Sequence, residues 1–495
     1  MTMSKFKAAM KKTKMKKLLQ KIKKFQKNSD EDGSITDDDI DILEDEFIGN
    51  IIDNQYVIIK YIGRGTFSRV WLLFDFENSK FVVFKVYFPK EKDEFQYELA
   101  ALNRIKDKNF EHNIVFDSYL KINFENNDDQ EHNNNINPCL ILPYMGLSLS
   151  DIMDKKKVLS ISELKYVTRQ LLLSLRELHS IKTVHTDLKL DNILSNYHSQ
   201  KNIDFINWFN SLNIKEQYNK LFVMNTPEDF NNFNRNKKKL HKRKIKSRTL
   251  KAVGIYLKKK ITDYLNNEFI NDNYQNDDQT NEINSNESGS ESESESGSES
   301  DHESGSESDH ESGSGSESDT ESEINIFDLK FTLTDYSNAL HIDEIHEDDE
   351  LQIRAYRSPE NIMGFKYNYK SELWAIGCLM WDLMTEKYIF EPELNGQSVD
   401  RDREQLSLME RFLGRFPKDM SLDCDRSYDL FEESGRIKKF RKVEKYSLED
   451  ELKDIRNDLT DEQISDLCKF LRLIWCYNPK QRISVDEALN HTFLN

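Results

Sequence analysis

The sequence predicts an α+β fold with two lobes, a small β-rich N-lobe followed by a large helical C-lobe, and the second lobe is split by a long insert. Three observations predict this fold. First, three β-rich runs separated by turns lie between Tyr56 and Val86, which indicates an antiparallel sheet. Second, apolar residues recur at helical spacing after Asp151. Third, the composition between residues 197 and 325 becomes polar and repetitive, which is unsuited to a compact core.

Changes in composition set the boundaries of these parts. We expect an N-terminal arm, first basic and then acidic, at residues 1–50 and the N-lobe at residues 51–146. The C-lobe is expected in two parts, at residues 147–196 and 326–495, separated by a low-complexity spacer insert at residues 197–325. The first half of the insert retains aromatic residues and is compatible with short helices. Its end consists mainly of Ser, Glu, Gly and Asp, so we expect disorder there and in the arm.

Charge and cysteine content narrow the class of protein. The formal net charge is −19, but the tract Glu287–Glu323 holds 14 acidic residues and no Lys or Arg, so the negative charge is local. The five cysteines lack metal-binding spacing, which indicates free thiols in a reducing compartment. The sequence has no apolar run long enough to cross a membrane and no secretory signal. We therefore expect an intracellular protein of the cytoplasm, the nucleus or both. We also expect it to be a monomer.

A glycine-rich turn, Gly63-Arg-Gly65, joins the first two predicted strands. By itself this pattern fits a tight hairpin as well as a phosphate-binding loop. Lys85 follows in an otherwise apolar strand, where a buried ammonium group requires a partner, and Glu98 on the next predicted helix supplies one. The order of these residues indicates a nucleotide site in which Lys85 holds the α- and β-phosphates and Glu98 holds Lys85.

The adenine end of this site is expected where the apolar run Leu140–Leu142 meets the first predicted helix of the C-lobe. Backbone groups at this connection between the lobes would bond the adenine ring, although an ordinary turn explains the local pattern equally well. The predicted nucleotide-binding residues are therefore Ile62, Gly63, Gly65, Ser68, Val70, Lys85, Glu98, Pro143 and Met145.

The most informative pattern is His185-Thr-Asp187-Leu-Lys189-Leu-Asp-Asn192, which is the catalytic-loop pattern of protein kinases. In this pattern Asp187 orients a substrate hydroxyl and accepts its proton, while Lys189 neutralises charge on the transferred phosphoryl group. Asn192 and Asp335, which lie 143 residues apart (335 − 192), would hold Mg²⁺. The sequence therefore predicts a protein kinase that uses ATP and Mg²⁺.

The segment after Asp335 indicates how the kinase would be regulated. Thr186 stands where most kinases carry the Arg that binds an activation-segment phosphate, and the only hydroxyl between residues 338 and 357 is that of Tyr356. Both the phosphate and its receptor are missing, so we expect activity without activation-segment phosphorylation. Further on, Glu360 and Arg482 are expected to form a buried ion pair with a structural role.

Four features together resemble the SR-protein kinases, and the resemblance covers nearly all of the chain outside the arm and the insert. They are the glycine loop with Ser68 in place of the third glycine, Thr186 before the catalytic Asp, the segment Gln352–Glu360, and the long spacer after the catalytic loop. The resemblance implies ATP-dependent phosphorylation of serines in Arg/Ser-rich proteins. It also implies that Asp450 and Asp454 in a late acidic cluster bind the substrate, although a solvated charged face explains such a cluster equally well.

Other functions remain open from the sequence alone. Ser337 replaces the usual glycine after the metal-binding Asp, and Glu372 replaces the Asp that braces the catalytic loop, so a pseudokinase scaffold is the alternative function. Within enzymes, the alternative is a proline-directed kinase with an unrelated insertion. The Lys-rich segments Lys5–Lys27 and Lys237–Lys260 fit binding of nucleic acid, an importin or an anionic membrane as well as they fit solubilising tails.

Overall fold

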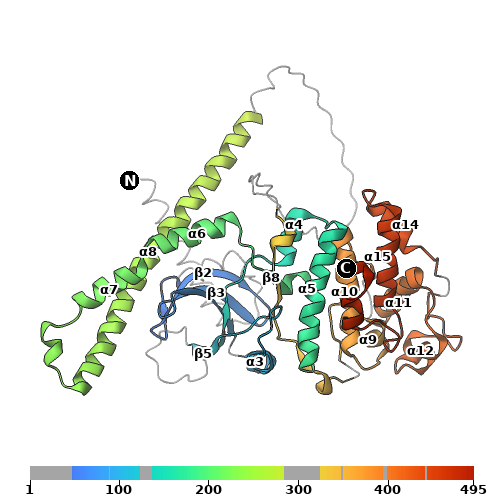
Figure 1. The fold of residues 1–495 in the computed structure, drawn as a ribbon, viewed down its shortest axis with the longest axis horizontal. Coiled ribbons are helices and arrows are strands. Elements are labelled where there is room, and N and C mark those ends of the chain that lie inside the picture. Colours follow the sequence, from blue (N-terminus) through green and yellow to red (C-terminus); the bar gives the residue numbers. More distant parts are fainter. Residues whose placement is uncertain are drawn as a thin grey trace, which may run out of the picture.

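The computed structural model describes residues 47–88, 90–122, 137–283, 324–346, 349–393, 398–440 and 443–495. Most of the N-terminal arm and the Ser/Glu-rich end of the insert, for which the sequence predicts disorder, lie outside the described residues. The described chain forms a small β-rich lobe and a large helical lobe, as predicted, and the helices of the insert lie along the small lobe (Figure 1).

The N-lobe is built on a six-stranded sheet of order β1-β2-β3-β4-β6-β5, in which every neighbouring pair is antiparallel. Its elements are β1 (Ile51–Ile52), β2 (Tyr56–Arg64), β3 (Ser68–Asp75), β4 (Lys80–Tyr87), helix α3 (Lys92–Ile105), β5 (Ser118–Ile122) and β6 (Asn137–Pro143). Side chains alternate along a strand, so Val82, Phe84 and Val86 of β4 are buried on one face. Val83 and Lys85 therefore lie on the opposite face, toward the C-lobe.

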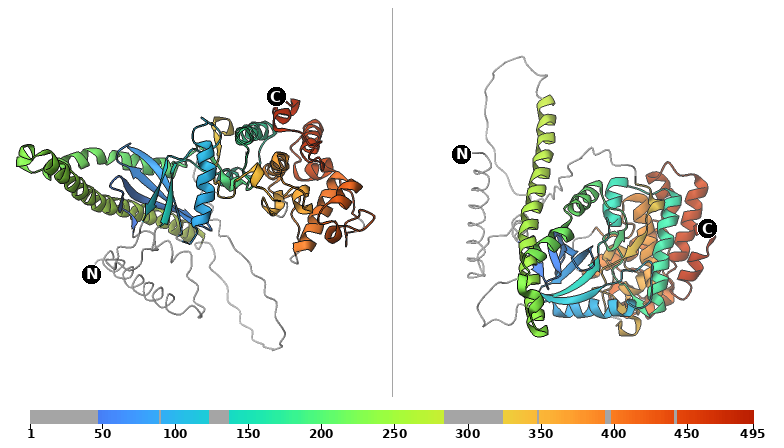
Figure 2. Two further views of the ribbon diagram at one scale, coloured as in Figure 1. Left: turned by 90° about the horizontal axis from the view of Figure 1, so that it is seen from below. Right: turned by 60° about the vertical axis from the view of Figure 1, so that its left-hand side comes forward.

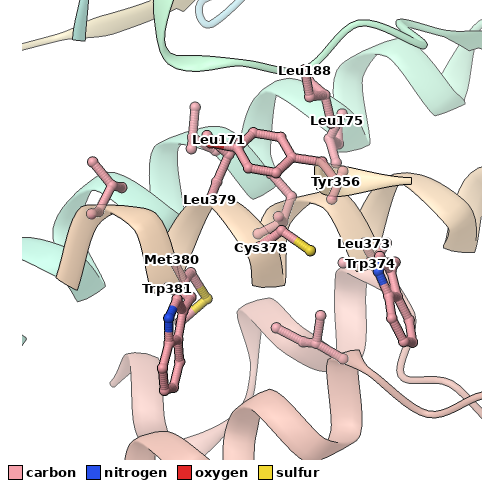
Figure 3. Close-up of a cluster of buried hydrophobic side chains, with 14 of the residues drawn as sticks. Leu171, Leu175, Leu188, Tyr356, Leu373, Trp374, Cys378, Leu379, Met380 and Trp381 are labelled. Atoms are coloured by element: carbon pink, nitrogen blue, oxygen red, sulfur yellow. The ribbon is translucent and has the colours of Figure 1, made fainter. Parts of the chain in front are cut away.

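The C-lobe is organised around helix α10 (Tyr369–Thr385), which is buried along nearly its whole length. Helix α5 (Ile161–Ser180) packs against α10, and Leu171 and Leu175 of α5 meet the apolar side chains of α10 in the core shown in Figure 3. Helix α15 (Asp461–Ile474) also packs on α10, beside Gly377. A Cβ atom at Gly377 would lie 2.5 Å from the Trp475 indole nitrogen, so only glycine permits this close approach.

The other elements of the C-lobe surround this core. Those before the insert are α4 (Leu149–Lys156), β7 (Thr183–Val184), η2 (Leu190–Asn192) and β8 (Ile193–Ser195). Those after it are η4 (Ile326–Asp328), β9 (Phe331–Leu333), β10 (Leu340–His341), η5 (Ile342–Glu344), η6 (Arg354–Tyr356), α9 (Pro359–Met363), α11 (Ser398–Leu413), α12 (Lys418–Asp423), α13 (Ser427–Leu430), α14 (Leu448–Ile455), α16 (Val485–Leu489) and η7 (Thr492–Leu494).

The predicted ion pair between Glu360 and Arg482 is confirmed. The two guanidinium nitrogens donate to the two carboxylate oxygens at 2.6 and 2.8 Å, and both residues are 1% exposed. Ser371 donates a further hydrogen bond to Glu360 at 2.7 Å. The pair joins the end of the activation segment to the late helices. Removal of one partner would destabilise the fold, because it would leave the other charge buried and unpaired.

The insert is more ordered than a low-complexity spacer. It contains α6 (Gln200–Ser211), α7 (Ile214–Met224), η3 (Glu228–Asn232) and the long helix α8 (Arg235–Ile283), and Figure 2 shows α8 crossing the small lobe and extending beyond it. Val253, Leu257 and Ile261 recur at helical spacing and are buried together with Val57 and Ile59 of β2. The many lysines of this stretch obscure the apolar stripe in the composition, which is why the sequence predicted only short helices.

Candidate active site

A cavity of about 430 Å³ lies between the N-lobe sheet and the C-lobe. Eight of the residues predicted from the sequence line this cavity: Ile62, Val70, Lys85, Glu98, Pro143, Met145, Asn192 and Asp335. Gly63, Gly65 and Ser68 lie at the turn between β2 and β3, outside this lining, and the Gly65 amide donates to the Ser68 carbonyl at 2.9 Å. The turn therefore closes as a tight loop at one edge of the cavity.

Three charged side chains, from β4, from α3 and from the loop after β9, meet at one wall of the cavity. Lys85 of β4 lies 2.7 Å from Glu98 of α3 and 2.8 Å from Asp335, measured from Nζ to the carboxylate oxygens. Glu98 is 1% exposed and accepts a second hydrogen bond, from the hydroxyl of Tyr87. The expected Lys85–Glu98 pair is therefore present, and it also positions the carboxylate that was predicted to hold the metal.

The same contacts fix the charges of this group. Burial by itself would lower the pKa of Lys85, but the carboxylates of Glu98 and Asp335 outweigh that effect and raise the pKa. Burial would likewise raise the pKa of Asp335, yet the Lys85 ammonium holds it well below its usual range. At neutral pH Lys85 is thus a cation and Asp335 an anion, which are the states needed to bind phosphate and metal.

Pairing of two short strands explains how residues on either side of the insert reach one site. Ile193 of β8 pairs with Leu333 of β9, and the Thr334 amide donates to the Asn192 carbonyl at 2.9 Å. Asn192 and Asp335 therefore lie at the same end of a two-stranded ladder and both line the cavity. The insert therefore leaves and returns at this ladder.

The catalytic loop holds Asp187 next to a cation and an amide. Lys189 Nζ lies 3.3 Å from Asp187 Oδ2. The Asn192 side-chain amide donates to the carbonyl oxygen of Asp187 at 2.8 Å and to its carboxylate at 3.1 Å. These bonds use the nitrogen of the Asn192 amide and leave its oxygen for another ligand.

The residues at the site fit Mg²⁺ and a nucleoside triphosphate. Mg²⁺ prefers oxygen ligands and is typically held by one or two protein groups together with phosphate oxygens, which matches the Asp335 carboxylate and the Asn192 amide oxygen. Lys85 is placed to bind phosphate, and the cavity is large enough for the rest of the nucleotide. When bound, the metal would neutralise phosphate charge; the protein itself supplies the orientation of Asp187 and the cations Lys85 and Lys189.

Glu372 performs the bracing role that its replacement of Asp had placed in doubt. It is fully buried, and its Oε1 accepts the backbone amides of His185 at 2.6 Å and Thr186 at 3.1 Å. Its Oε2 lies 2.7 Å from the Nε2 of His179. Thr186 has a φ of 64°, a strained value for a β-branched residue, so these hydrogen bonds hold a backbone that would otherwise relax.

Ser337 also proves compatible with the site. The sequence suggested that a residue other than glycine restricts this loop, but Ser337 is not among the non-glycine residues with positive φ in the described chain, whereas Asp335 is, at 60°. The Ser337 hydroxyl instead donates to Asp335 Oδ1 at 2.8 Å. The substitution therefore adds a hydrogen bond to the proposed metal ligand.

Several contributors to the site were not predicted from the sequence. The side chain of Gln352 bonds both backbone groups of Leu188, accepting from its amide at 3.2 Å and donating to its carbonyl at 2.5 Å. Asn202 and Phe205 of the insert helix α6 line the cavity. Only the aromatic content of the early insert hinted at a packed role, and no local signal connected it to the nucleotide site.

Comparison with known proteins identifies the class. The protein kinase domain family matches residues 56–224 and 323–494, so the chain belongs to that family. A solved kinase domain aligns with a TM-score of 0.51 and 16% identity, over 90% of this chain and 97% of that one, which supports the fold.

Within this class the relatives are serine/threonine kinases. The SRPK serine/threonine-protein kinase of Physarum polycephalum is 23% identical over 90% of this chain and 87% of its own length. A putative serine/threonine-protein kinase, L205, of Acanthamoeba polyphaga mimivirus is 24% identical over 91% and 90%. Human SRSF protein kinase 3 is 26% identical over 34% and 29%. The chain is a protein serine/threonine kinase, and the predicted resemblance to the SR-protein kinases is confirmed.

Proposed function

We propose that this kinase uses Mg-ATP to phosphorylate serines in Arg/Ser-rich proteins and that it does so without activation-segment phosphorylation. The main support for the proposed substrate class is an acidic face on α14. The names of the SRPK and SRSF kinase relatives also support this substrate class. The observation that carries the independence from phosphorylation is the set of hydrogen bonds that already holds the activation segment.

Helix α14 presents Asp450 and Asp454 on one face, one helical turn apart, and both are exposed. Two neighbouring acidic residues are engaged elsewhere: Glu449 pairs with Arg472 at 2.5 Å, and Asp458 with Arg456 at 2.8 Å. The first pair anchors the helix to α15. What remains is a small negative face on a fixed helix, which suits the guanidinium groups of an Arg-rich peptide.

The activation segment is tied down without a phosphate. The Thr186 hydroxyl donates to the Asn338 carbonyl at 2.6 Å, where an Arg would otherwise bind a phosphate. Gln352 clamps the catalytic loop through Leu188, as described above. The only hydroxyl between residues 338 and 357, that of Tyr356, is 1% exposed and donates to Asp382 at 2.5 Å. It is thus buried and not placed for modification.

Initial rates on matched peptides test the substrate class. We expect phosphorylation of an Arg-Ser repeat peptide, and little transfer to a Ser-Pro peptide, because a proline offers no charge for the acidic face. The double variant Asp450→Asn/Asp454→Asn should raise KM for the Arg-Ser peptide about two- to thirtyfold with little change in kcat, since two exposed ion pairs contribute roughly 0.2–1 kcal/mol each.

The matched control is Asp419→Asn/Asp423→Asn on α12, which removes two exposed carboxylates with the same spacing from another helix of the C-lobe. This control should leave KM unchanged. Equal KM values for wild type and for the α14 variant, or preferential transfer to the Ser-Pro peptide, would overturn the assignment of the substrate. A large gain in activity after treatment with an upstream kinase, mapped to residues 338–357, would overturn the proposed independence.

A further inference from the structure

A second cavity, also about 430 Å³, lies between α8 and the start of the N-lobe sheet and shares no lining residue with the nucleotide site. One wall is formed by residues 47–52, where the described chain begins, and the other by residues of α8 from Ser247 to Lys258. Its floor is apolar and includes Ile58 and Ile122, which are 1% and 5% exposed. The protein kinase mechanism does not use this groove.

The two walls approach each other closely because each carries a glycine. A Cβ atom on Gly49 would lie 2.6 Å from the Gly254 carbonyl oxygen, and one on Gly254 would lie 2.3 Å from the Gly49 carbonyl oxygen. Gly49 also has a φ of 82°, a value that favours glycine. The described chain therefore begins in the wall of the groove, at Phe47, next to a point that backbone packing fixes.

The α8 wall is basic and partly apolar. Lys251 and Lys258 line the groove, and Ile255, which lies between them, is 66% exposed. Lys244 and Arg248 continue the same face toward the start of the helix. Lys246 pairs with Glu77 at 2.8 Å, whereas among the described residues Lys244, Arg248 and Lys251 form no ion pair. Between residues 235 and 260 the chain has no Asp or Glu, so this stretch of α8 supplies no carboxylate to the face.

The segment that precedes Phe47 in the sequence has the opposite character. Residues 30–46 contain ten Asp and Glu, no Lys or Arg, and the apolar residues Ile35, Ile40, Ile42 and Leu43. The distance from Lys258 back to Lys244 is about 21 Å at the rise of an α-helix. Ten residues of extended chain before Phe47 span up to about 33 Å. The segment is therefore long enough to cover the whole basic face.

We propose that the acidic segment Asp30–Glu46 docks in cis on this groove, with its carboxylates against Lys244, Arg248, Lys251 and Lys258 and its apolar residues against Ile255. The inference goes beyond phosphoryl transfer and does not depend on the proposed substrate class. It gives the basic face of α8 an intramolecular occupant, so that binding of an external polyanion requires displacement of the segment.

Hydrogen–deuterium exchange of the full chain tests this docking. In the wild type, amides in residues 30–46 should exchange about tenfold or more slowly than in the variant Lys251→Glu/Lys258→Glu, because charge reversal repels the segment. Raising the salt concentration should also speed exchange in the wild type, since the Debye length falls to about 3 Å at 1 M. Combining the α8 reversal with Asp37→Lys/Asp38→Lys/Asp39→Lys should restore slow exchange.

The matched control is Lys239→Glu/Lys242→Glu, which reverses two exposed lysines on the same helix outside the groove, and it should leave exchange in residues 30–46 unchanged. Basal kinase activity of all these variants reports that each one folds. Rapid exchange of residues 30–46 in the wild type, unaffected by charge reversal, would overturn the proposal. A second result would also overturn it. This result is tight binding of a labelled uridine 20-mer to the wild type, with the same affinity as to a variant in which the ten acidic residues are replaced by Asn and Gln.

Discussion

Substitution of Glu372 gives a graded test of how the catalytic loop is held. Glu372→Ala removes the acceptor of two buried backbone amides, those of His185 and Thr186, and the partner of His179. Each buried amide left without an acceptor costs about 1–3 kcal/mol, so the expected loss of stability is about 2–6 kcal/mol. In a domain of this size each kcal/mol lowers the Tm by roughly 2–4 °C.

Two milder variants separate the effect of side-chain length at position 372 from the effect of its charge. Glu372→Gln keeps an oxygen for both amides and loses only the charge opposite His179, so it should cost about 1 kcal/mol. Glu372→Asp keeps the charge but is one methylene shorter, so it should lose at least one hydrogen bond from a backbone amide. Its loss of stability should therefore lie between those of the Gln and Ala variants. A loop displaced by about 1 Å can lower kcat about 100-fold, and we expect kcat to follow the same order.

The assay is denaturant unfolding of each variant together with kcat at saturating Mg-ATP. The predicted order of damage is Ala, then Asp, then Gln. An Ala variant within 1 kcal/mol of the wild type, or an Asp variant more stable than the wild type, would refute the view that Glu372 rather than a water or another side chain braces the loop.

The remaining predictions concern the activation segment and α14. Gln352→Ala removes both hydrogen bonds to Leu188 and should lower kcat about tenfold. KM for ATP should stay unchanged, because Gln352 does not contact Lys85. Steady-state kinetics that show a higher KM for ATP would contradict this. Arg472 holds the pKa of Glu449 at about 2, below its ordinary value of 4.5, so this pair contributes stability that is present above pH 4.5 and lost as the pH falls toward 2. The stability difference between the wild type and Arg472→Ala should therefore be full at neutral pH and shrink over that window in acid unfolding experiments; a difference that is constant with pH would show that the pair is not the cause.

Local sequence patterns predicted the site because kinase chemistry depends on residue types in a fixed order. The pairing of Lys85 with Glu98 was predicted correctly from the apolar context of Lys85 and the order of the motifs, and the residues from His185 to Asn192 were recognisable from their spacing. Their convergence with Asp335 was not derivable from distance along the chain, because it rests on the pairing of β8 with β9 across the insert. Long-range strand pairing leaves no periodic mark in either strand.

The supporting residues were harder to predict, because their roles depend on how far a side chain extends in the folded protein and not only on which amino acid it is. Glu372 is one methylene longer than the usual Asp, and its two oxygens bond the loop and His179 separately. Ser337 seemed too rigid, but the positive φ belongs to Asp335 instead. The insert hid an apolar stripe among lysines, so its helices and the approach of Phe205 to the nucleotide cavity became evident only in three dimensions.

The most direct test of the central claim is transfer of labelled phosphate from Mg-ATP to an Arg-Ser repeat peptide by the wild type and by Asp187→Ala. Asp187 is held by Lys189 and Asn192 but lies outside the lining of the nucleotide cavity, so the variant should still bind ATP. We expect the wild type to transfer phosphate and the variant to lose about 100- to 10,000-fold in rate, the contribution of a positioned acid–base group. Equal transfer by both proteins, or no transfer from folded wild type that binds ATP, would contradict the account.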